Sequence, residues 1–199
     1  FIRVMDSLTL AISQGSLRRG SAAVYLDVDH PEIEEFIEIR KASGDFNRKS
    51  LNLHHGVLLT DAFMEAVRDG TDFPLRSPRT REVMSRVDAR ALFQRIVETR
   101  IATGEPYLVF IDTVNRTLPQ HQRELGLTVT TSNLCSEITL ATGPDHLGQD
   151  RTAVCCLSSL NCETWEEWKG DRRFIEDVMR FLDNVLQDFI DRAPDAMAR

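Results

Sequence analysis

The sequence predicts an α/β fold with a mostly parallel sheet, either open or closed into a barrel. Short runs rich in β-forming residues alternate with helix-like segments along the chain. The 199 residues are enough for one domain with a substantial core. No internal repeat, low-complexity tract or linker divides the chain. We therefore expect one domain, or part of one, over residues 1–199.

The first half of the chain alternates helix and strand signals. Apolar residues at helical spacing indicate the first helix, and β-forming residues indicate the strands. Pro31 suits the first turn of the second helix, whose glutamates favour its N-terminus. The expected elements are a helix over 1–13 ended by Gln14-Gly15-Ser16, a strand over 22–28, a helix over 30–41, a strand over 51–59 and a short helix over 62–67.

The second half begins with residues 73–83, which are expected to form a loop. Asp88 is the expected cap of a helix that stops at Gly104. The remaining expected elements are a buried strand over 106–112, extended segments over 131–140 and 153–160 joined by a polar turn over 142–151, and a long amphipathic helix over 174–190.

Composition excludes several classes of protein. The net charge of −7 argues against sequence-independent nucleic-acid binding, and no apolar run reaches the roughly 20 residues that span a membrane. All four cysteines lie within the last third of the chain, and no signal peptide is visible, so a secreted disulfide scaffold is not expected. The sequence favours a reducing, cytoplasmic setting without nucleic-acid or membrane partners.

One short motif carries distinctive chemistry. Asn133, Cys135 and Glu137 alternate, and an extended chain would point all three to one side. A carboxylate beside a thiol disfavours the thiolate, which argues against a hydrolase nucleophile. A neutral thiol next to a carboxylate suits one-electron chemistry, in which sulfur takes a hydrogen atom and the carboxylate takes a proton.

The other cysteines do not indicate a metal site or a local disulfide. Cys155, Cys156 and Cys162 form no C-x₂₋₄-C pair with each other or with Cys135, so no metal site is expected. Adjacent Cys155 and Cys156 have Cα atoms about 3.8 Å apart, too close for an ordinary disulfide. Small buried side chains are expected at Cys156 and Cys162. Neither G-x-G-x-x-G nor a P-loop signature occurs.

Five ordered blocks resemble the catalytic, or large, subunit of ribonucleotide reductase. The central block is N-L-C-x-E, followed about twenty residues later by A-V-C-x-L-S-S-L-N. The resemblance covers essentially the whole chain. The other blocks are QGSLRRGSAAVYLDVDHPEIEEFIEIRK, LNLHHGVLLTDAFMEAV, TGEPYLVFIDTVNR and FIEDVMRFLDNVLQDFI.

The resemblance implies roles for four residues. Cys135 would carry the transient thiyl radical that takes hydrogen from C3′ of the ribose. Glu137 would accept the 3′-hydroxyl proton, and Asn133 would hydrogen-bond the sugar hydroxyls. Cys155 would be one cysteine of the reducing pair, with its partner upstream of Phe1. Cys156 stands where the family commonly has another residue and takes no part.

The resemblance also implies a flexible specificity loop, which relays the bound deoxynucleotide effector to the choice of base. Without the resemblance, a solvated basic turn is the simpler interpretation of this segment. Its arginines could contact a base or a phosphate. The loop comprises Gln14, Gly15, Ser16, Leu17, Arg18, Arg19, Gly20 and Ser21.

On this resemblance the chain is expected to be an interior fragment of a ten-stranded α/β barrel, with Cys135 on an inserted finger loop. The expected substrate is a ribonucleoside diphosphate, with a triphosphate as the less favoured alternative, and the expected reductant is thioredoxin or glutaredoxin. ATP or deoxynucleotide effectors, with Mg, and a homodimer are also implied. No cofactor is expected to be bound covalently in this segment.

The radical source separates two classes of enzyme. S-N-L-C-S-E with T-G-E-P-Y resembles the class I enzymes, whose radical arises on a separate small, metal-containing subunit. Adenosylcobalamin-dependent relatives more often resemble N-P-C-G-E and remain an alternative. Glu137 and Cys155 argue against the class that uses a glycyl radical and formate. Two further hypotheses are a non-catalytic nucleotide-binding relative and a cysteine hydrolase.

Overall fold

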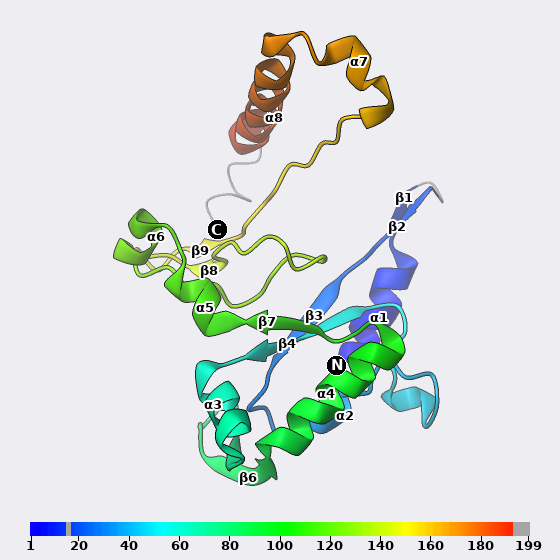
Figure 1. Ribbon diagram of the computed structural model, residues 1–199, viewed down its shortest axis with the longest axis vertical. Helices are drawn as coiled ribbons and strands as arrows, with labels where there is room; N and C mark the ends of the chain where they lie inside the picture. The colour runs from blue at the N-terminus through cyan, green and yellow to red at the C-terminus, as the bar shows by residue number, and fades with distance from the viewer. Residues whose placement is uncertain (15–16, 193–199) are drawn as a thin grey trace. The chain divides into compact units, whose positions relative to one another are not determined.

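The computed structural model describes residues 1–14 and 17–192 (Figure 1). Gly15 and Ser16 of the expected specificity loop lie outside these residues. The chain divides into two compact units. Residues 1–120 and 129–140 form the first, here called the sheet unit, and residues 121–128 and 141–199 form the second, here called the helical unit.

A parallel three-stranded sheet organises the sheet unit. Its strands are β3 (Ala23–Asp27), β4 (His54–Leu59) and β7 (Tyr107–Phe110), in the order β3-β4-β7. Both pairings are parallel, as the alternation of strands and helices predicts. The three strands predicted for this region are confirmed, each trimmed by one to three residues at its ends.

The sheet has two different faces. Val24 and Leu26 of β3 pack on the main core, so Tyr25 between them lies on the opposite face. The strand register aligns Tyr25 with Gly56 of β4 and Gly56 with Tyr107 of β7. Directly aligned residues of parallel strands point to one side of the sheet, so these three form a row across the face that lies away from the core.

Three helices pack on the core face: α2 (Ile33–Ile37), α3 (Asp61–Asp69) and α4 (Ala89–Thr103). The predicted caps of α4 are confirmed, because the Asp88 carboxylate accepts a hydrogen bond from the Ala91 N–H and Gly104 ends the helix with φ 82°. Figure 1 shows α2 and α4 on the same side of the sheet. The core comprises Val28, Ile33, Phe36, Ile37, Ile39, Val57, Leu59, Phe63, Phe73, Leu75, Ala89, Leu92 and Ile96.

Residues 73–83 were expected to form a loop, and that prediction is wrong. The strand β5 (Asp72–Arg76) pairs with β6 (Val83–Asp88) in an antiparallel hairpin. Phe73 and Leu75 alternate into the core, whereas β6 is mostly exposed. Only one of the two strands therefore carries an apolar alternation, and the polar sequence around the turn hides the pairing.

A buried carboxylate ties the N-terminal helix α1 (Ile2–Ala11) to residues 50–53. Its only buried residues are Asp6 and Thr9. The Asp6 carboxylate accepts hydrogen bonds from the Ser50 hydroxyl (2.7 Å), the Asn52 amides (2.8 and 2.9 Å) and the Leu53 N–H (3.1 Å). Burial alone would raise the pKa of Asp6, but these hydrogen bonds lower it overall.

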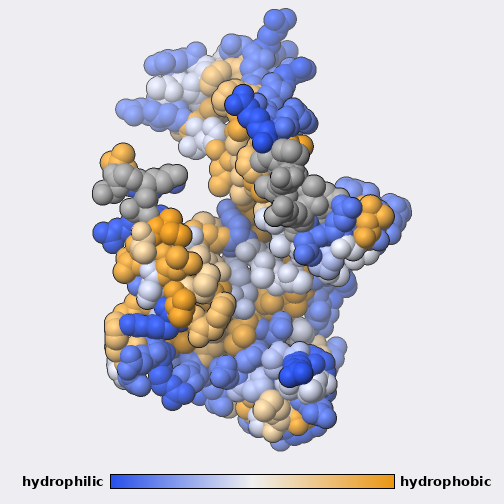
Figure 2. Space-filling view, turned by 180° about the vertical axis from the view of Figure 1, so that it is seen from behind, coloured by the Kyte–Doolittle hydropathy of each residue, from blue (hydrophilic) through white to orange (hydrophobic). Residues whose placement is uncertain are grey.

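The outward side of α1 is apolar, as Figure 2 shows from behind. The exposed large apolar side chains on and beside this helix are Phe1, Val4, Leu8, Leu10 and Ile12. After α1, β1 (Ser13–Gln14) pairs with β2 (Arg18–Arg19) in a short antiparallel hairpin. The expected helix therefore ends at Ala11, and the expected loop is carried on this hairpin.

Other short elements complete the sheet unit. The 3₁₀ helix η1 (Phe46–Arg48) precedes β4, and α5 (Ile111–Arg116) begins directly after β7. The expected helix over 30–41 is shorter than predicted. Beyond Ile37 the backbone closes three-residue turns, such as Glu38 N–H to the Glu35 carbonyl and Lys41 N–H to the Glu38 carbonyl.

The helical unit contains short elements and one long helix. The polar turn predicted over 142–151 is a hairpin of two-residue strands, and the long helix α8 (Arg172–Arg192) confirms the predicted amphipathic helix. None of the described residues of the helical unit is buried. The elements after the sheet unit are α6 (Gln120–Glu124), β8 (Gly143–Pro144), β9 (Asp150–Arg151), η2 (Cys162–Thr164), α7 (Trp165–Trp168) and α8 (Arg172–Arg192).

No helix among residues 1–14 and 17–192 has the length and apolar character needed to cross a membrane.

Candidate active site

The segment that carries Cys135 folds back on itself as a tight loop. The Asn133 N–H donates to the Ile138 carbonyl (3.1 Å), and the Ile138 N–H donates to Asn133 Oδ1 (2.9 Å). Between them the Ser136 N–H donates to the Asn133 carbonyl (3.2 Å), with Ser136 in the left-handed region at φ 67°. Leu134 and Cys135 are therefore the central residues of a turn.

This geometry corrects the expectation of an extended chain over residues 131–140. Alternating residues of a strand share a side, but a left-handed residue between Cys135 and Glu137 breaks that alternation. Both side chains are exposed at the turn. Cys135 lies within the turn and Glu137 directly follows its last residue, Ser136, so residues 129–140 form a loop, here called the finger loop, and not a strand.

Asn133 has a structural task within the loop. Its Oδ1 accepts hydrogen bonds from the Ile138 N–H and from the Ser132 hydroxyl (3.2 Å). A hydrogen bond from Asn133 to a sugar hydroxyl would therefore come from its Nδ2 group. The residue thus shapes the turn as well as offering a donor beside Cys135.

Two side chains anchor the finger loop to the sheet unit. The Tyr25 hydroxyl donates to the Asn133 carbonyl (2.8 Å) and lies 2.9 Å from the Ser136 hydroxyl. At the base of the loop, the Asn115 side chain accepts from the Val129 N–H (2.8 Å) and donates to the Val129 carbonyl (3.0 Å). No local motif indicates these anchors, because Tyr25 and Asn115 lie far from Cys135 in the sequence.

The sheet unit provides no histidine partner for Cys135 among its described residues. His30 Nδ1 accepts from the Glu32 N–H, while His54 and His55 both bond Glu105. A cysteine hydrolase would need an imidazole base within hydrogen-bond reach of its thiol. Within this unit the structure therefore argues against the hydrolase hypothesis.

Glu105 is a buried carboxylate just before β7 whose contacts the sequence did not indicate. It is 5% exposed and accepts from His54 Nδ1 (2.5 Å), His55 Nδ1 (2.8 Å) and the His55 N–H (3.1 Å). Burial alone would raise the pKa of Glu105, but the bonds from His55 and His54, with the charge of Arg40, lower it to about 2. This ionised cluster joins the starts of β4 and β7.

The remaining cysteines lie in the helical unit, and each is a free thiol. Cys155 is exposed, in a stretch over 152–161 without regular secondary structure. Cys156 is half-buried. Cys162 is exposed at the start of η2, so the expectation that it is buried is wrong for this unit. The short η2 turn leaves its side chain at the surface of the unit.

The expected specificity loop lies between α1 and β3. Leu17, Arg18 and Arg19 are exposed, and so is Ser21. Gly20 donates its N–H to the Ile12 carbonyl (2.7 Å), and a Cβ added there would lie 2.7 Å from the Thr9 carbonyl oxygen. Only glycine fits this close approach, which fixes the end of the loop against α1.

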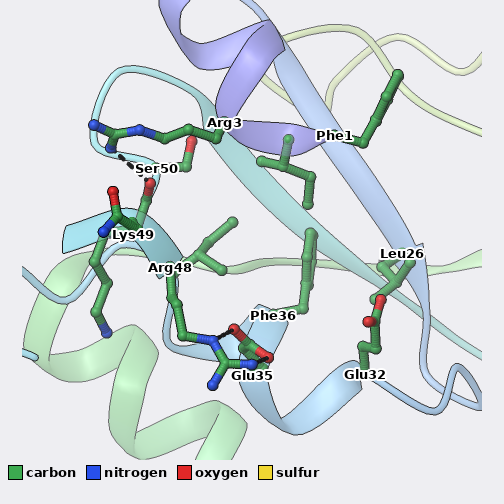
Figure 3. Close-up of a pocket in the computed structure, with 12 residues that line it drawn as sticks. Phe1, Arg3, Leu26, Glu32, Glu35, Phe36, Arg48, Lys49 and Ser50 are labelled. Atoms are coloured by element: carbon green, nitrogen blue, oxygen red, sulfur yellow. Dashed lines mark hydrogen bonds and ion pairs between the residues drawn. The ribbon is translucent and has the colours of Figure 1, made fainter. Parts of the chain in front are cut away.

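A pocket of about 310 Å³ lies apart from these residues, beside the start of α1 (Figure 3). Both of its arginines are already engaged: Arg48 pairs with Glu35 (2.7 Å), and Arg3 donates to the Lys49 carbonyl (3.1 Å). No residue of the finger loop lines it. Elsewhere among the described residues, no three His, Cys, Asp or Glu side chains converge in a way that could hold a metal ion.

Comparison with known proteins identifies the family. The ribonucleotide reductase barrel domain matches residues 1–196. A protein of frog virus 3 (isolate Goorha), provisionally named a ribonucleoside-diphosphate reductase large subunit, is 48% identical over 194 residues, which are 98% of this chain and 33% of that protein. A vitamin B12-dependent ribonucleotide reductase of Streptomyces coelicolor is 35% identical over 205 residues, covering 91% of this chain and 20% of that protein.

A solved structure shows the same similarity. The class Id ribonucleotide reductase alpha subunit of Actinobacillus ureae superposes with a TM-score of 0.71 at 30% identity, covering 97% of this chain and 31% of that chain. This chain spans a third or less of the length of each of these three proteins. The chain belongs to the ribonucleotide reductase family and forms part of its α/β barrel domain.

Proposed function

We propose that the full-length protein containing this chain reduces ribonucleoside diphosphates to 2′-deoxyribonucleoside diphosphates for DNA precursor synthesis in the cytoplasm. In this proposal residues 1–199 are an interior piece of a single catalytic barrel domain. The observation that carries it is the anchored turn that presents Cys135, with Glu137 two residues further on. A thiol and a carboxylate held at one tip suit catalysis by positioning.

The first half of the reaction uses the finger loop. The radical generator supplies a one-electron oxidation of the Cys135 thiol, which also loses its proton. Cys135 then takes a hydrogen atom from C3′ of the ribose, and Glu137 accepts the proton of the 3′-hydroxyl. Asn133 donates a hydrogen bond to the sugar from Nδ2, since its Oδ1 is engaged within the turn.

The second half of the reaction uses a dithiol. Cys155 and a cysteine from outside this chain supply two electrons and two protons, and they end as a disulfide. The 2′-hydroxyl leaves as water, C2′ gains hydrogen, and Cys135 returns its hydrogen atom to C3′. Thioredoxin or glutaredoxin then reduces the disulfide. The exposed position of Cys155 in an irregular stretch is compatible with exchange between partners.

Substrate choice is assigned to the segment from Gln14 to Ser21. Exposed Arg18 and Arg19 can contact the base or phosphates of a nucleotide, and a deoxynucleotide or ATP effector, with Mg, would bind nearby. We place this site at the interface of a homodimer. The apolar outward side of α1, next to the loop, is compatible with such an interface.

A small metal-containing subunit is the proposed radical source. The viral relative is named a large subunit and the solved relative an alpha subunit, names that imply a second kind of subunit. The alternative source is adenosylcobalamin, because a B12-dependent reductase is also similar over most of the chain. A non-catalytic nucleotide-binding relative would have no reason to retain the complete N-x-C-x-E residues, so we favour an active enzyme.

The test is reduction of CDP by the full-length protein with a dithiol reductant and an effector nucleotide. One arm contains the cognate radical subunit, another contains adenosylcobalamin, and Cys135→Ala is run in both, with Cys162→Ala as the matched control. We expect turnover with the subunit, none from Cys135→Ala and normal turnover from Cys162→Ala.

Each different outcome has a definite meaning. Turnover with adenosylcobalamin alone would keep the mechanism and change the radical source. No turnover in either arm, with effector still bound, would favour the non-catalytic relative. Turnover that survives Cys135→Ala would exclude the thiyl mechanism.

A further inference from the structure

The two tyrosines of this chain lie on either side of one glycine, on the sheet face opposite the core. A Cβ built on Gly56 would lie 2.5 Å from Cε1 of Tyr25, far closer than packed atoms come. The Tyr25 ring therefore leans across β4 over the glycine. In that orientation its hydroxyl reaches the turn around Cys135, more than a hundred residues later in the chain.

The Tyr25 hydroxyl meets the turn at both of its closing residues. It donates to the Asn133 carbonyl (2.8 Å) and pairs with the Ser136 hydroxyl (2.9 Å), and Cys135 lies between these two residues. Ser136 has φ 67°, a conformation that a serine keeps only where surrounding contacts hold it. The phenol is such a contact, since it bonds the side chain of the strained residue itself.

We propose that Tyr25 is a positioning residue, whose hydroxyl fixes the turn that presents Cys135 to the substrate. The proposal rests on the proposed function, because it assigns Tyr25 to the same site. Gly56 serves the same end by leaving room for the ring. Tyr25 acts through the backbone of Asn133 and the side chain of Ser136 and does not itself react.

Tyr107 lies on the other side of Gly56, on the same face of the sheet. Burial raises the pKa of its hydroxyl, and the nearby carboxylate of Glu105 raises it further. The ring also stacks on His54, with centroids 6.1 Å apart, which ties it to the Glu105 cluster.

The test compares Tyr25→Phe, Ser136→Ala and the double variant in the full-length protein. Tyr25→Phe removes only the hydroxyl, so the ring stays over Gly56. We expect kcat for CDP reduction to fall about 10- to 100-fold while KM changes less than about twofold, because misplacing a reacting group costs rate more than affinity. Ser136→Ala should lower kcat less, and the double variant should resemble Tyr25→Phe alone.

A second readout does not depend on activity. Amide hydrogen exchange over residues 133–138 should become faster in Tyr25→Phe, while the thermal midpoint stays close to that of the wild type. Thr80→Ala is the matched control, because it removes a hydroxyl hydrogen-bonded in the exposed turn between β5 and β6. It should change neither the exchange of the finger loop nor kcat.

The outcomes separate this inference from the proposed function. If the wild type reduces CDP but Tyr25→Phe keeps its kcat and its exchange over 133–138, Tyr25 does not position the turn. If the wild type fails to reduce CDP with either radical source, the proposed function is wrong, whatever the exchange shows. Gly56→Ala gives an independent check, because the added methyl should displace the ring of Tyr25 and reproduce the kcat and exchange of Tyr25→Phe. Combining Gly56→Ala with Tyr25→Phe should cause little further loss of kcat.

Discussion

Cys135 and Cys155 are both exposed free thiols, yet their surroundings differ sharply. Cys135 lies in a turn closed by three hydrogen bonds between Asn133, Ser136 and Ile138. Side chains from β3 and α5 anchor that loop at its tip and base. Cys155 lies in an irregular stretch of a unit in which none of the described residues is buried.

The difference matches the two tasks that we propose for these thiols. A radical that takes one particular hydrogen atom needs a fixed position relative to the sugar. A thiol that forms a disulfide and is then reduced by another protein must meet successive partners. Hydrogen bonds within the sheet unit fix the position of Cys135. Within the helical unit Cys155 is exposed, so its thiol is open to such partners.

The largest effect that tests this comparison is expected from Cys155→Ser. The variant should lose multiple turnover with thioredoxin completely, because one half of the reducing dithiol is gone, while substrate and effector still bind. Cys156→Ser is the matched control and should retain most activity, since the neighbouring thiol takes no part. CDP reduction measured side by side gives the answer. If the two variants were affected the other way round, Cys156 would be the reducing thiol.

The next largest effect is expected from Glu105, which joins the starts of β4 and β7. Glu105→Gln removes a carboxylate whose pKa of about 2 lies well below the ordinary glutamate value of 4.5. A depressed pKa contributes stability that is full above the unfolded value, here about 3 kcal/mol, and that is lost as pH falls through the folded value. We therefore expect the thermal midpoint of the variant to drop by about 5 °C or more at pH 7.

The pH dependence sharpens that test. The gap between wild type and Glu105→Gln should stay constant above about pH 5 and close as pH falls toward 2. Glu98→Gln, on the exposed side of α4, should shift the midpoint little at any pH. A gap that stayed open at pH 2 would mean that the carboxylate charge is not what stabilises this cluster.

The smallest effect is expected at the base of the finger loop. Asn115→Ala leaves the N–H and carbonyl of Val129, which is 2% exposed, without their partner. The cost should be about 1–3 kcal/mol, seen as a lower thermal midpoint and faster amide exchange near residue 129. Asn47→Ala in the exposed η1 is the control. Unchanged exchange at Val129 would show that the loop is held by its tip alone.

The sequence predicts the regular elements of the sheet unit well, because their signals are local. Buried strands read as apolar runs, and Asp88 and Gly104 mark the ends of α4 through backbone rules that act within a few residues. The β5–β6 hairpin was not predicted because β6 is exposed and carries no apolar alternation. A strand that forms because of its pairing with a neighbouring strand has no clear pattern in its own sequence.

The candidate site was predictable in its reacting groups but not in its support. The residues Asn133, Cys135 and Glu137 are close together in the sequence. Their alternation predicts a strand, but the left-handed conformation of Ser136 makes this segment a turn. Tyr25 and Asn115 reach the loop only through the fold. Glu105 forms hydrogen bonds with His54 and His55, which lie about fifty residues earlier in the chain. No periodicity records such contacts.

The double anchoring of the finger loop also limits where the chain can change its length. Asn115 holds Val129 and Tyr25 holds Asn133, so both ends of this four-residue step are fixed to the sheet unit. An inserted residue there would have to bulge or release an anchor. The turn at residues 146–148 between β8 and β9 is largely exposed, so an inserted tag or epitope should be tolerated there and not beside the finger loop.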